Sequence, residues 1–141
     1  MTLQDAPEWA VSMLGDARVA RLALLDEEDL PRVLPVTFAV WEGDVWSAID
    51  QKRKRAPEPA RVRRLRRRPD AALLVDRYDD DWDKLWWARA DGVARILDDL
   101  DPAAMAALAG RYPRYRRPPP GPALGPMVEI AVERWSGWSA T

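Results

Sequence analysis

The chain has 141 residues, 48% of them hydrophobic, which is enough for one domain with a buried core spanning residues 1–141. It contains no cysteine and no histidine. Disulfides, Cys/His zinc sites, Ser-His-Asp hydrolysis and histidine acid–base catalysis are therefore excluded. With 22 basic and 23 acidic side chains the formal net charge is −1, which argues against a protein that binds nucleic acid over its whole surface.

No segment has the features of a targeting or membrane-spanning element. The first nine residues lack the basic and apolar regions of a signal peptide. No apolar run approaches the length needed to span a bilayer. We therefore expect a soluble cytoplasmic protein that has no membrane partner.

The first third of the chain is predicted to form a short helix followed by strands. Residues 7–15 have a proline at their start and a glycine at their end, as a short helix does. Residues 18–25, 33–40 and 45–49 are apolar or alternating and are separated by polar turns, so we expect three strands joined by two hairpins. Pro35 cannot donate to a sheet, so its strand should lie at an edge or a bulge.

The middle of the chain is predicted to form a helix and two further strands. Residues 60–68 place apolar side chains three apart among arginines, and a proline follows them. Residues 71–78 form a continuous apolar run, which is typical of a central strand. Residues 85–97 read as a long strand, with a bend or bulge at Asp91 and Gly92.

The last third of the chain is predicted to form a helix and a closing strand. Residues 102–110 begin with proline after Asp101, a good N-terminal cap. Residues 116–126 are rich in proline and should be irregular, and residues 127–134 read as the closing strand. About six mostly antiparallel strands with a few short helices indicate a mainly β fold, a small barrel with helices at its rims.

A dense basic segment is the most informative local feature of the sequence. Nearly half of the 22 lysines and arginines lie between Lys52 and Arg68, directly after the strand at 45–49. Lys52 and Lys54 are two residues apart, so an extended chain would direct both to one side and could clamp a phosphate. The arginines at 66–68 fit a solvated helix face better, because long cationic side chains commonly cover surface.

Small and aromatic residues lie near this basic segment. Ser47, Ala48 and Ile49 precede the clamp, and small side chains would let a flat ring approach the backbone, although such residues also fill barrel interiors. Trp82 lies in an acidic turn, where it could cover a ring or pack against a second subunit. The adjacent tryptophans at 86–87 point to opposite faces of a strand, so we expect one in the core and one at a dimer interface.

The sequence contains no recognisable metal loop or dinucleotide-binding loop. The acidic turn at 79–83 lacks the glycine and distal glutamate of a calcium-binding loop, so we predict no metal site. No GxGxxG or Walker pattern is present. A nucleotide-like cofactor would therefore have to bind by the rules of another fold.

Several segments together resemble a known family. The LVDRYDDDWDKLWW block at 74–87 and the closing RWSGW at 134–138 are the specific parts, and the resemblance covers nearly the whole chain. The pattern is similar to the pyridoxamine-5'-phosphate-oxidase-like split β-barrel oxidoreductases. It most closely resembles their actinobacterial branch, which uses the deazaflavin coenzyme F420.

The resemblance implies a homodimer with two cofactor sites at the subunit interface and a set of cofactor-binding residues. Lys52 and Lys54 would grip the cofactor phosphate, and Trp82 would close the site. Arg63 and Arg64 could meet the phosphate or the anionic tail of the deazaflavin. Backbone of two strands would line the ring, at Pro35, Val36, Thr37, Ser47, Ala48 and Ile49.

The implied activity is hydride transfer between the reduced cofactor and an unidentified small molecule, with no catalytic residue assigned. An FMN-dependent enzyme of the same fold is the nearest alternative, because the same lysines would serve its phosphate. A non-catalytic carrier of F420 is a further alternative. Nucleic-acid binding by the arginine helix is disfavoured, because aromatic residues are not interleaved with the basic run.

Overall fold

The computed structural model describes residues 14–51, 58–116 and 123–141. It contains one seven-stranded sheet with antiparallel neighbours, so the predicted mainly β fold is confirmed. Within these ranges no helix is long and apolar enough to cross a membrane. In chain order the elements are β1 (Ala20–Leu25), β2 (Pro31–Val36), β3 (Ala39–Trp41), β4 (Asp44–Gln51), α2 (Ala60–Arg67), β5 (Asp70–Arg77), η2 (Trp82–Lys84), β6 (Trp86–Leu97), α3 (Pro102–Arg111), η3 (Pro113–Arg116) and β7 (Ala123–Ser139).

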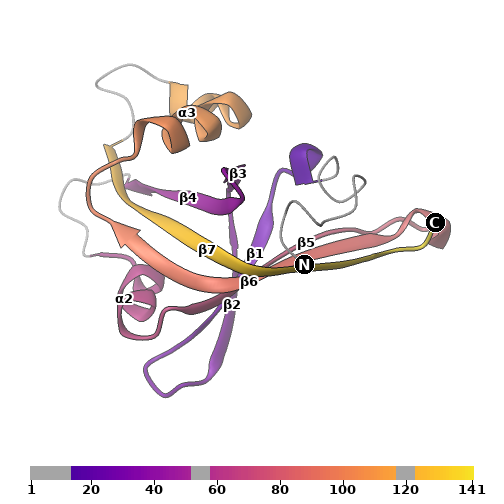
Figure 1. Cartoon of the computed structure of the whole chain (residues 1–141), viewed down its shortest axis with the longest axis horizontal. Coiled ribbons are helices and arrows are strands. Elements are labelled where there is room, and N and C mark those ends of the chain that lie inside the picture. The colour runs from indigo at the N-terminus through magenta and orange to yellow at the C-terminus, as the bar shows by residue number, and fades with distance from the viewer. Residues whose placement is uncertain (1–13, 52–57, 117–122) are drawn as a thin grey trace.

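The strand order β2-β1-β5-β6-β7-β4-β3 places two consecutive strands at opposite ends of the sheet. Only Thr37 and Phe38 separate the end of β2 from the start of β3. Because an extended residue spans only about 3.3–3.6 Å, the sheet must curl until its two ends lie near each other. Figure 1 shows this curled sheet, from which β5, β6 and β7 extend as a long arm.

The predicted single strand at 33–40 is wrong in one respect, because the chain leaves the sheet at Thr37 and Phe38. As a result β2 pairs with β1, whereas β3 pairs with β4, and the second neighbour of β4 is β7. The edge position predicted for Pro35 is confirmed, since β2 is the first strand of the sheet. The predicted helix at 7–15 lies largely outside the described residues.

Side chains replace the missing sheet partners at this break. The Phe38 N–H donates to the Tyr112 hydroxyl at 3.1 Å, and the same hydroxyl lies 3.1 Å from the Phe38 carbonyl oxygen. Ser47 Oγ donates to the Thr37 carbonyl oxygen at 2.7 Å. Phe38 is fully buried, so its backbone groups require such partners. The break is therefore held by α3 and β4.

The core fills the inside of the curled sheet. Alternate residues of β1, β5, β6 and β7 point inward, and α2 adds the buried Val62 and Leu65. A second cluster joins α3 to β4 and β7 through Leu108, Trp46 and Met127. Asp101 caps α3 by accepting from the Ala104 N–H at 3.0 Å, as the sequence predicted. The inward strand at 71–78 is also confirmed, because β5 lies between β1 and β6.

Strands β6 and β7 are paired along almost their whole length and form the arm. The register shifts between Asp91 and Gly92, so the predicted bulge is confirmed. A Cβ built on Gly92 would lie 2.1 Å from the carbonyl oxygen of Ala131. Glycine is therefore required here by the close approach of two backbones.

We expect Gly92→Ala to destabilise the protein by about 1–3 kcal/mol, because the new methyl group overlaps backbone that cannot rotate away. The matched control is Gly110→Ala near the end of α3, where nothing lies within 4 Å of the added Cβ. That change should be neutral or stabilise by up to about 1 kcal/mol. Urea unfolding of both variants measures the difference, and equal midpoints would contradict the prediction.

We expect Tyr112→Phe to destabilise the protein by about 1–3 kcal/mol, because it leaves the buried Phe38 N–H without a partner. Tyr78→Phe provides a control that removes a hydroxyl from a residue 69% exposed, and it should change stability by less than about 0.5 kcal/mol. Thermal or urea unfolding of the two variants is the measurement. A Tyr112→Phe protein as stable as the parent would show that the break does not depend on this hydroxyl.

Candidate functional site

A cavity of about 290 Å³ opens at the break between β2 and β3. It brings together residues from two strands, from the start of α2 and from the segment around η3. The lining residues are Pro35, Val36, Thr37, Ser47, Ala48, Arg61, Tyr112, Arg114 and Tyr115. The cavity forms here because the chain leaves the sheet and exposes the edge of β4 beyond Trp46, the last residue that pairs with β3.

Five of the residues predicted to contact a ring lie together in this lining, namely Pro35, Val36, Thr37, Ser47 and Ala48. Ile49 is buried at 2% exposure and is not part of the lining. The ladder between β4 and β7 shifts between Ala48 and Asp50, so Ile49 is the bulged residue. The sequence therefore identified both strand walls of the cavity.

Arg61, which sequence reasoning did not single out, supplies a cation to this cavity. It is half-buried in the first turn of α2, and burial lowers the pKa of its guanidinium. Within the described residues it has no hydrogen bond or ion pair. A partly desolvated cation without a counter-ion favours an anion beside it. Its place next to the inward-facing Val62 was the available sequence signal.

Two tyrosines that the sequence analysis also missed complete the polar wall. The hydroxyls of Tyr115 and Thr37 are 2.7 Å apart, and the two tyrosine rings meet edge to face with centroids 5.9 Å apart. These residues come from the segment that follows α3, whereas Thr37 comes from the break. No local sequence pattern joins positions that are 78 residues apart.

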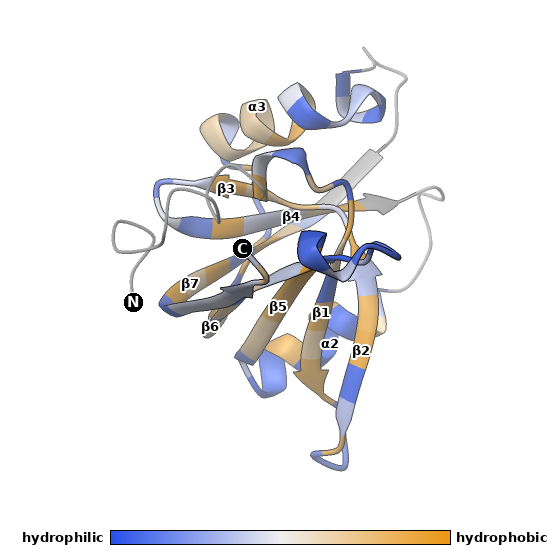
Figure 2. Cartoon of the chain, turned by 90° about the vertical axis from the view of Figure 1, so that its right-hand side faces the viewer, coloured by the Kyte–Doolittle hydropathy of each residue, from blue (hydrophilic) through white to orange (hydrophobic). Residues whose placement is uncertain are grey.

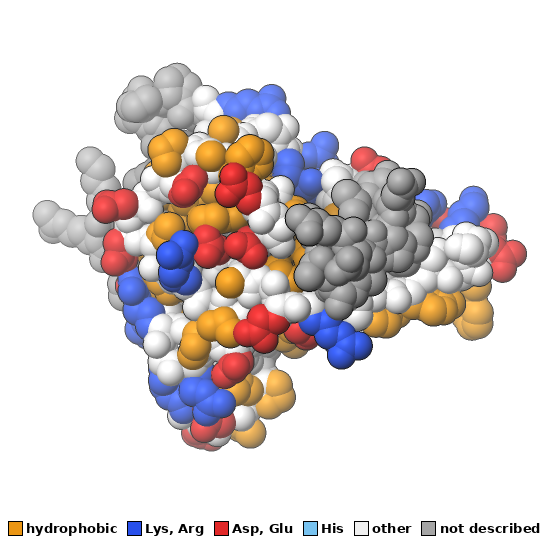
Figure 3. Space-filling view, in the orientation of Figure 1, with side chains coloured by type: hydrophobic (Ala, Val, Ile, Leu, Met, Phe, Trp, Pro, Cys, Tyr) orange, Lys and Arg blue, Asp and Glu red, His pale blue; other side chains and the backbone are white. Residues whose placement is uncertain are grey.

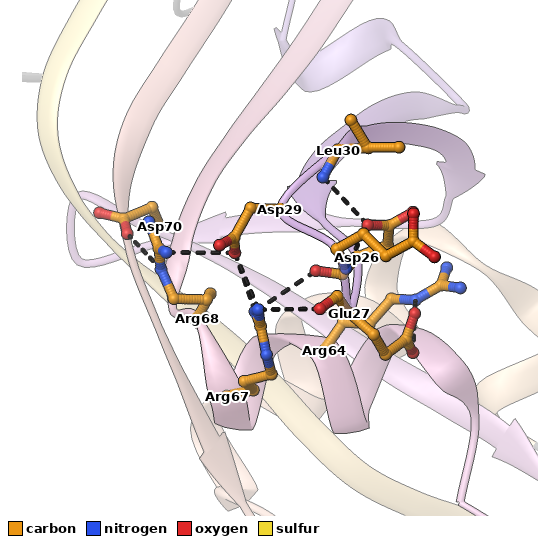
Figure 4. A network of polar contacts seen from close by, with 9 residues as sticks. Asp26, Glu27, Asp29, Leu30, Arg64, Arg67, Arg68 and Asp70 are labelled. Carbon is orange, nitrogen blue, oxygen red and sulfur yellow. Dashed lines mark hydrogen bonds and ion pairs between the residues drawn. The ribbon is translucent and has the colours of Figure 1, made fainter.

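The remaining arginines of α2 are directed to the β1–β2 turn, not to the cavity (Figure 4). Arg64 pairs with Glu27 at 3.1 Å, and Arg67 pairs with Asp29 at 2.9 Å. Arg68 also reaches Asp29 at 3.1 Å. The predicted solvated face at 66–68 is exposed, but it is neutralised by carboxylates of the same chain.

The carboxylates of this turn are held in their charged form. The Leu30 N–H hydrogen bond lowers the pKa of Asp26 against the opposing effect of burial, and the charge of Arg32 adds to the lowering. The hydrogen bond from Arg64 lowers the pKa of Glu27. These groups therefore stay ionised at neutral pH and compete with any external anion for the helix arginines.

Several predicted site residues are not brought to the cavity within one chain. Lys52 and Lys54 lie outside the described residues. Arg63 donates to the Glu58 carbonyl oxygen at 2.6 Å, and Arg64 is held by Glu27. Trp82 begins η2 at the tip of the arm, where it is 68% exposed. Of the two adjacent tryptophans, residue 86 is buried and residue 87 is half-buried.

Solved structures with the same fold cover nearly the whole chain. A conserved hypothetical protein from Mycobacterium tuberculosis is 21% identical, with a TM-score of 0.72 over 96% of this chain and 86% of that one. A FAD-binding protein from Mesorhizobium loti is 17% identical, with a TM-score of 0.64 over 92% and 89%. A FAD-binding protein from Mycobacterium smegmatis is 16% identical, with a TM-score of 0.62 over 94% and 95%.

No curated protein matches the chain. The family model described as pyridoxamine 5'-phosphate oxidase, however, matches residues 7–139. This match covers nearly the whole sequence and agrees with the curled sheet and with the neighbouring structures. The chain belongs to the pyridoxamine 5'-phosphate oxidase family of split β-barrels.

Proposed function

We propose that the protein is an oxidoreductase that uses the deazaflavin coenzyme F420 in hydride transfer to a small molecule. The cavity at the break carries the proposal, because it joins five predicted ring-contacting residues to a cation that has no partner among the described residues. Family membership supports a flavin-like cofactor, and two neighbouring structures are FAD-binding proteins. The choice of F420 rests on the resemblance of the sequence.

The cavity fits the anionic part of such a cofactor. Its volume of about 290 Å³ is at the lower end for small-molecule sites, which typically measure about 300–1,000 Å³, so a nucleotide-sized molecule would extend beyond it. We propose that Arg61 holds the phosphate together with Lys52 and Lys54. The two lysines enter on the resemblance and on their position directly after β4.

The cofactor, when bound, supplies the hydride chemistry, and the protein binds and orients it. Backbone at Thr37 and Ser47 borders the opening, where small side chains let a flat ring lie close. The paired hydroxyls of Thr37 and Tyr115 offer one hydrogen-bonding position at the rim. Hydride transfer needs no strong protein base, so the absence of histidine is compatible with this role.

FMN is the alternative cofactor, because the same cations would bind its terminal phosphate. A carrier that binds F420 without catalysis uses the same site. Titration with each cofactor, followed by absorption and fluorescence, separates the two cofactors. Turnover of reduced cofactor over a panel of oxidised small molecules then separates an enzyme from a carrier.

We expect Arg61→Gln to weaken cofactor binding by about 1.5–3 kcal/mol, because it removes a charge-assisted contact. Lys54→Ala should have an effect of the same size. Arg66→Gln is the matched control in the same helix, since Arg66 pairs with Glu58 and Asp98 away from the cavity. Dissociation constants for F420 and FMN measure the effect. Unchanged constants in both Arg61→Gln and Lys54→Ala would remove the cavity from the proposal.

We further propose a homodimer in which the second copy approaches this site. Trp82, Arg63 and Arg64, which lie away from the cavity of their own chain, remain candidates for contacts to the cofactor tail or to the second copy. Sedimentation equilibrium should give about twice the chain mass of 16.0 kDa. A mass equal to one chain at micromolar concentration would contradict the dimer and leave the cavity unaffected.

A further inference from the structure

A second hollow, a groove of about 600 Å³, lies on the outer face of the sheet. Its floor comes from residues that alternate with core residues on the same strands. Arg21 and Ala23 of β1, for example, alternate with the buried Leu22 and Leu24. Figure 2 shows β1 and β5 side by side in this part of the sheet, with β2 at its edge. The groove is therefore separate from the barrel core.

The groove is hollow because small residues oppose one another across the strands. Ala23 lies opposite Val33 on β2 and opposite Ala72 on β5. In the neighbouring row Arg21 lies opposite Leu74, which lies opposite a residue of β6. The two alanines thus leave a depression between longer side chains.

One end of the groove is aromatic. Trp87 of β6 lies opposite Trp138 of β7, and both contribute to the lining. Trp138 is 48% exposed, and the guanidinium of Arg89 lies 5.8 Å from the centre of a Trp87 ring. Figure 3 shows hydrophobic side chains gathered along the lower edge of the arm. Indole faces of this kind stack on planar ligands.

The groove and the cavity adjoin each other along β2. Val33 lines the groove and Pro35 lines the cavity, and residues two apart on a strand project from the same face. Arg21, which lines the groove, is the direct cross-strand partner of Pro35. A molecule in the groove would therefore have one end beside the cavity.

Charge at that end is positive. Arg77 and Arg89 of the lining are paired with Asp79 at 3.1 Å and with Asp91 at 3.0 Å. Arg21 has no hydrogen bond or ion pair among the described residues. Asp76, the one acidic residue of the lining, lies two residues beyond Leu74, in the row of Trp87. An acidic ligand group is thus favoured at Arg21 and disfavoured at the aromatic end.

We propose that this groove binds the substrate, a planar aromatic acid whose carboxylate is held by Arg21 and whose ring lies against Trp87 and Trp138. A volume of about 600 Å³ with mostly apolar lining and few polar groups is typical of a small-molecule site. The proposed function is needed only to name the ligand a substrate. A second copy of the chain is the other candidate occupant.

The test uses the full chain without cofactor and 2-naphthoate as the probe, with 2-naphthalenemethanol as its neutral analogue, in isothermal titration calorimetry. Arg21→Gln should weaken naphthoate binding about tenfold and leave the neutral analogue unchanged. Trp138→Ala should weaken both. Trp41→Ala, which removes another exposed tryptophan outside this groove, is the control and should change neither.

Absence of naphthoate binding, or equal affinity in all variants, would overturn the inference. Conversion of a dimer to a monomer by Trp138→Ala, without naphthoate binding to either protein, would assign the groove to a second copy and overturn it as well. F420 titration is carried out in parallel. Retained cofactor binding with no naphthoate binding contradicts only this inference, whereas naphthoate binding without cofactor binding contradicts only the proposed function.

Discussion

The structure depends on a two-residue connection between the first and last strands of its sheet. Thr37 and Phe38 tie the two ends together and force the sheet to curl, but they leave both ladders in doing so. Their polar groups are then satisfied by Ser47 and Tyr112, whose side chains arrive from other elements. The same departure from the sheet opens the cavity, so one constraint both closes the barrel and creates its candidate site.

Electrostatics divides the basic segment into two parts with different roles. Four arginines of α2 are paired with carboxylates of the same chain, and the β1–β2 turn supplies most of these partners. Arg61, one turn earlier, has no such partner within the described ranges and faces the cavity. A helix that looks uniformly cationic in sequence is thus mostly neutralised, and its capacity to bind an anion is concentrated at its start.

The edge strand β2 connects the two hollows of the molecule. Because alternate residues of a strand share a face, Val33 and Pro35 place an apolar groove beside a cationic cavity. The proposed cofactor and the proposed aromatic acid would then meet at Pro35 and Arg21. This arrangement separates the two binding requirements: phosphate recognition at α2 and ring recognition on the arm.

The sequence alone determined the elements, the edge position of Pro35, the cap at Asp101, the bulge at Gly92 and both strand walls of the cavity, because each follows from local propensity or alternation. Tertiary structure decided the split at Thr37, the partners of the helix arginines, and the arrival of Arg61, Tyr112 and Tyr115 at one cavity. These features join positions tens of residues apart, and local patterns carry no record of which distant side chain will satisfy an unpaired backbone group or a buried charge.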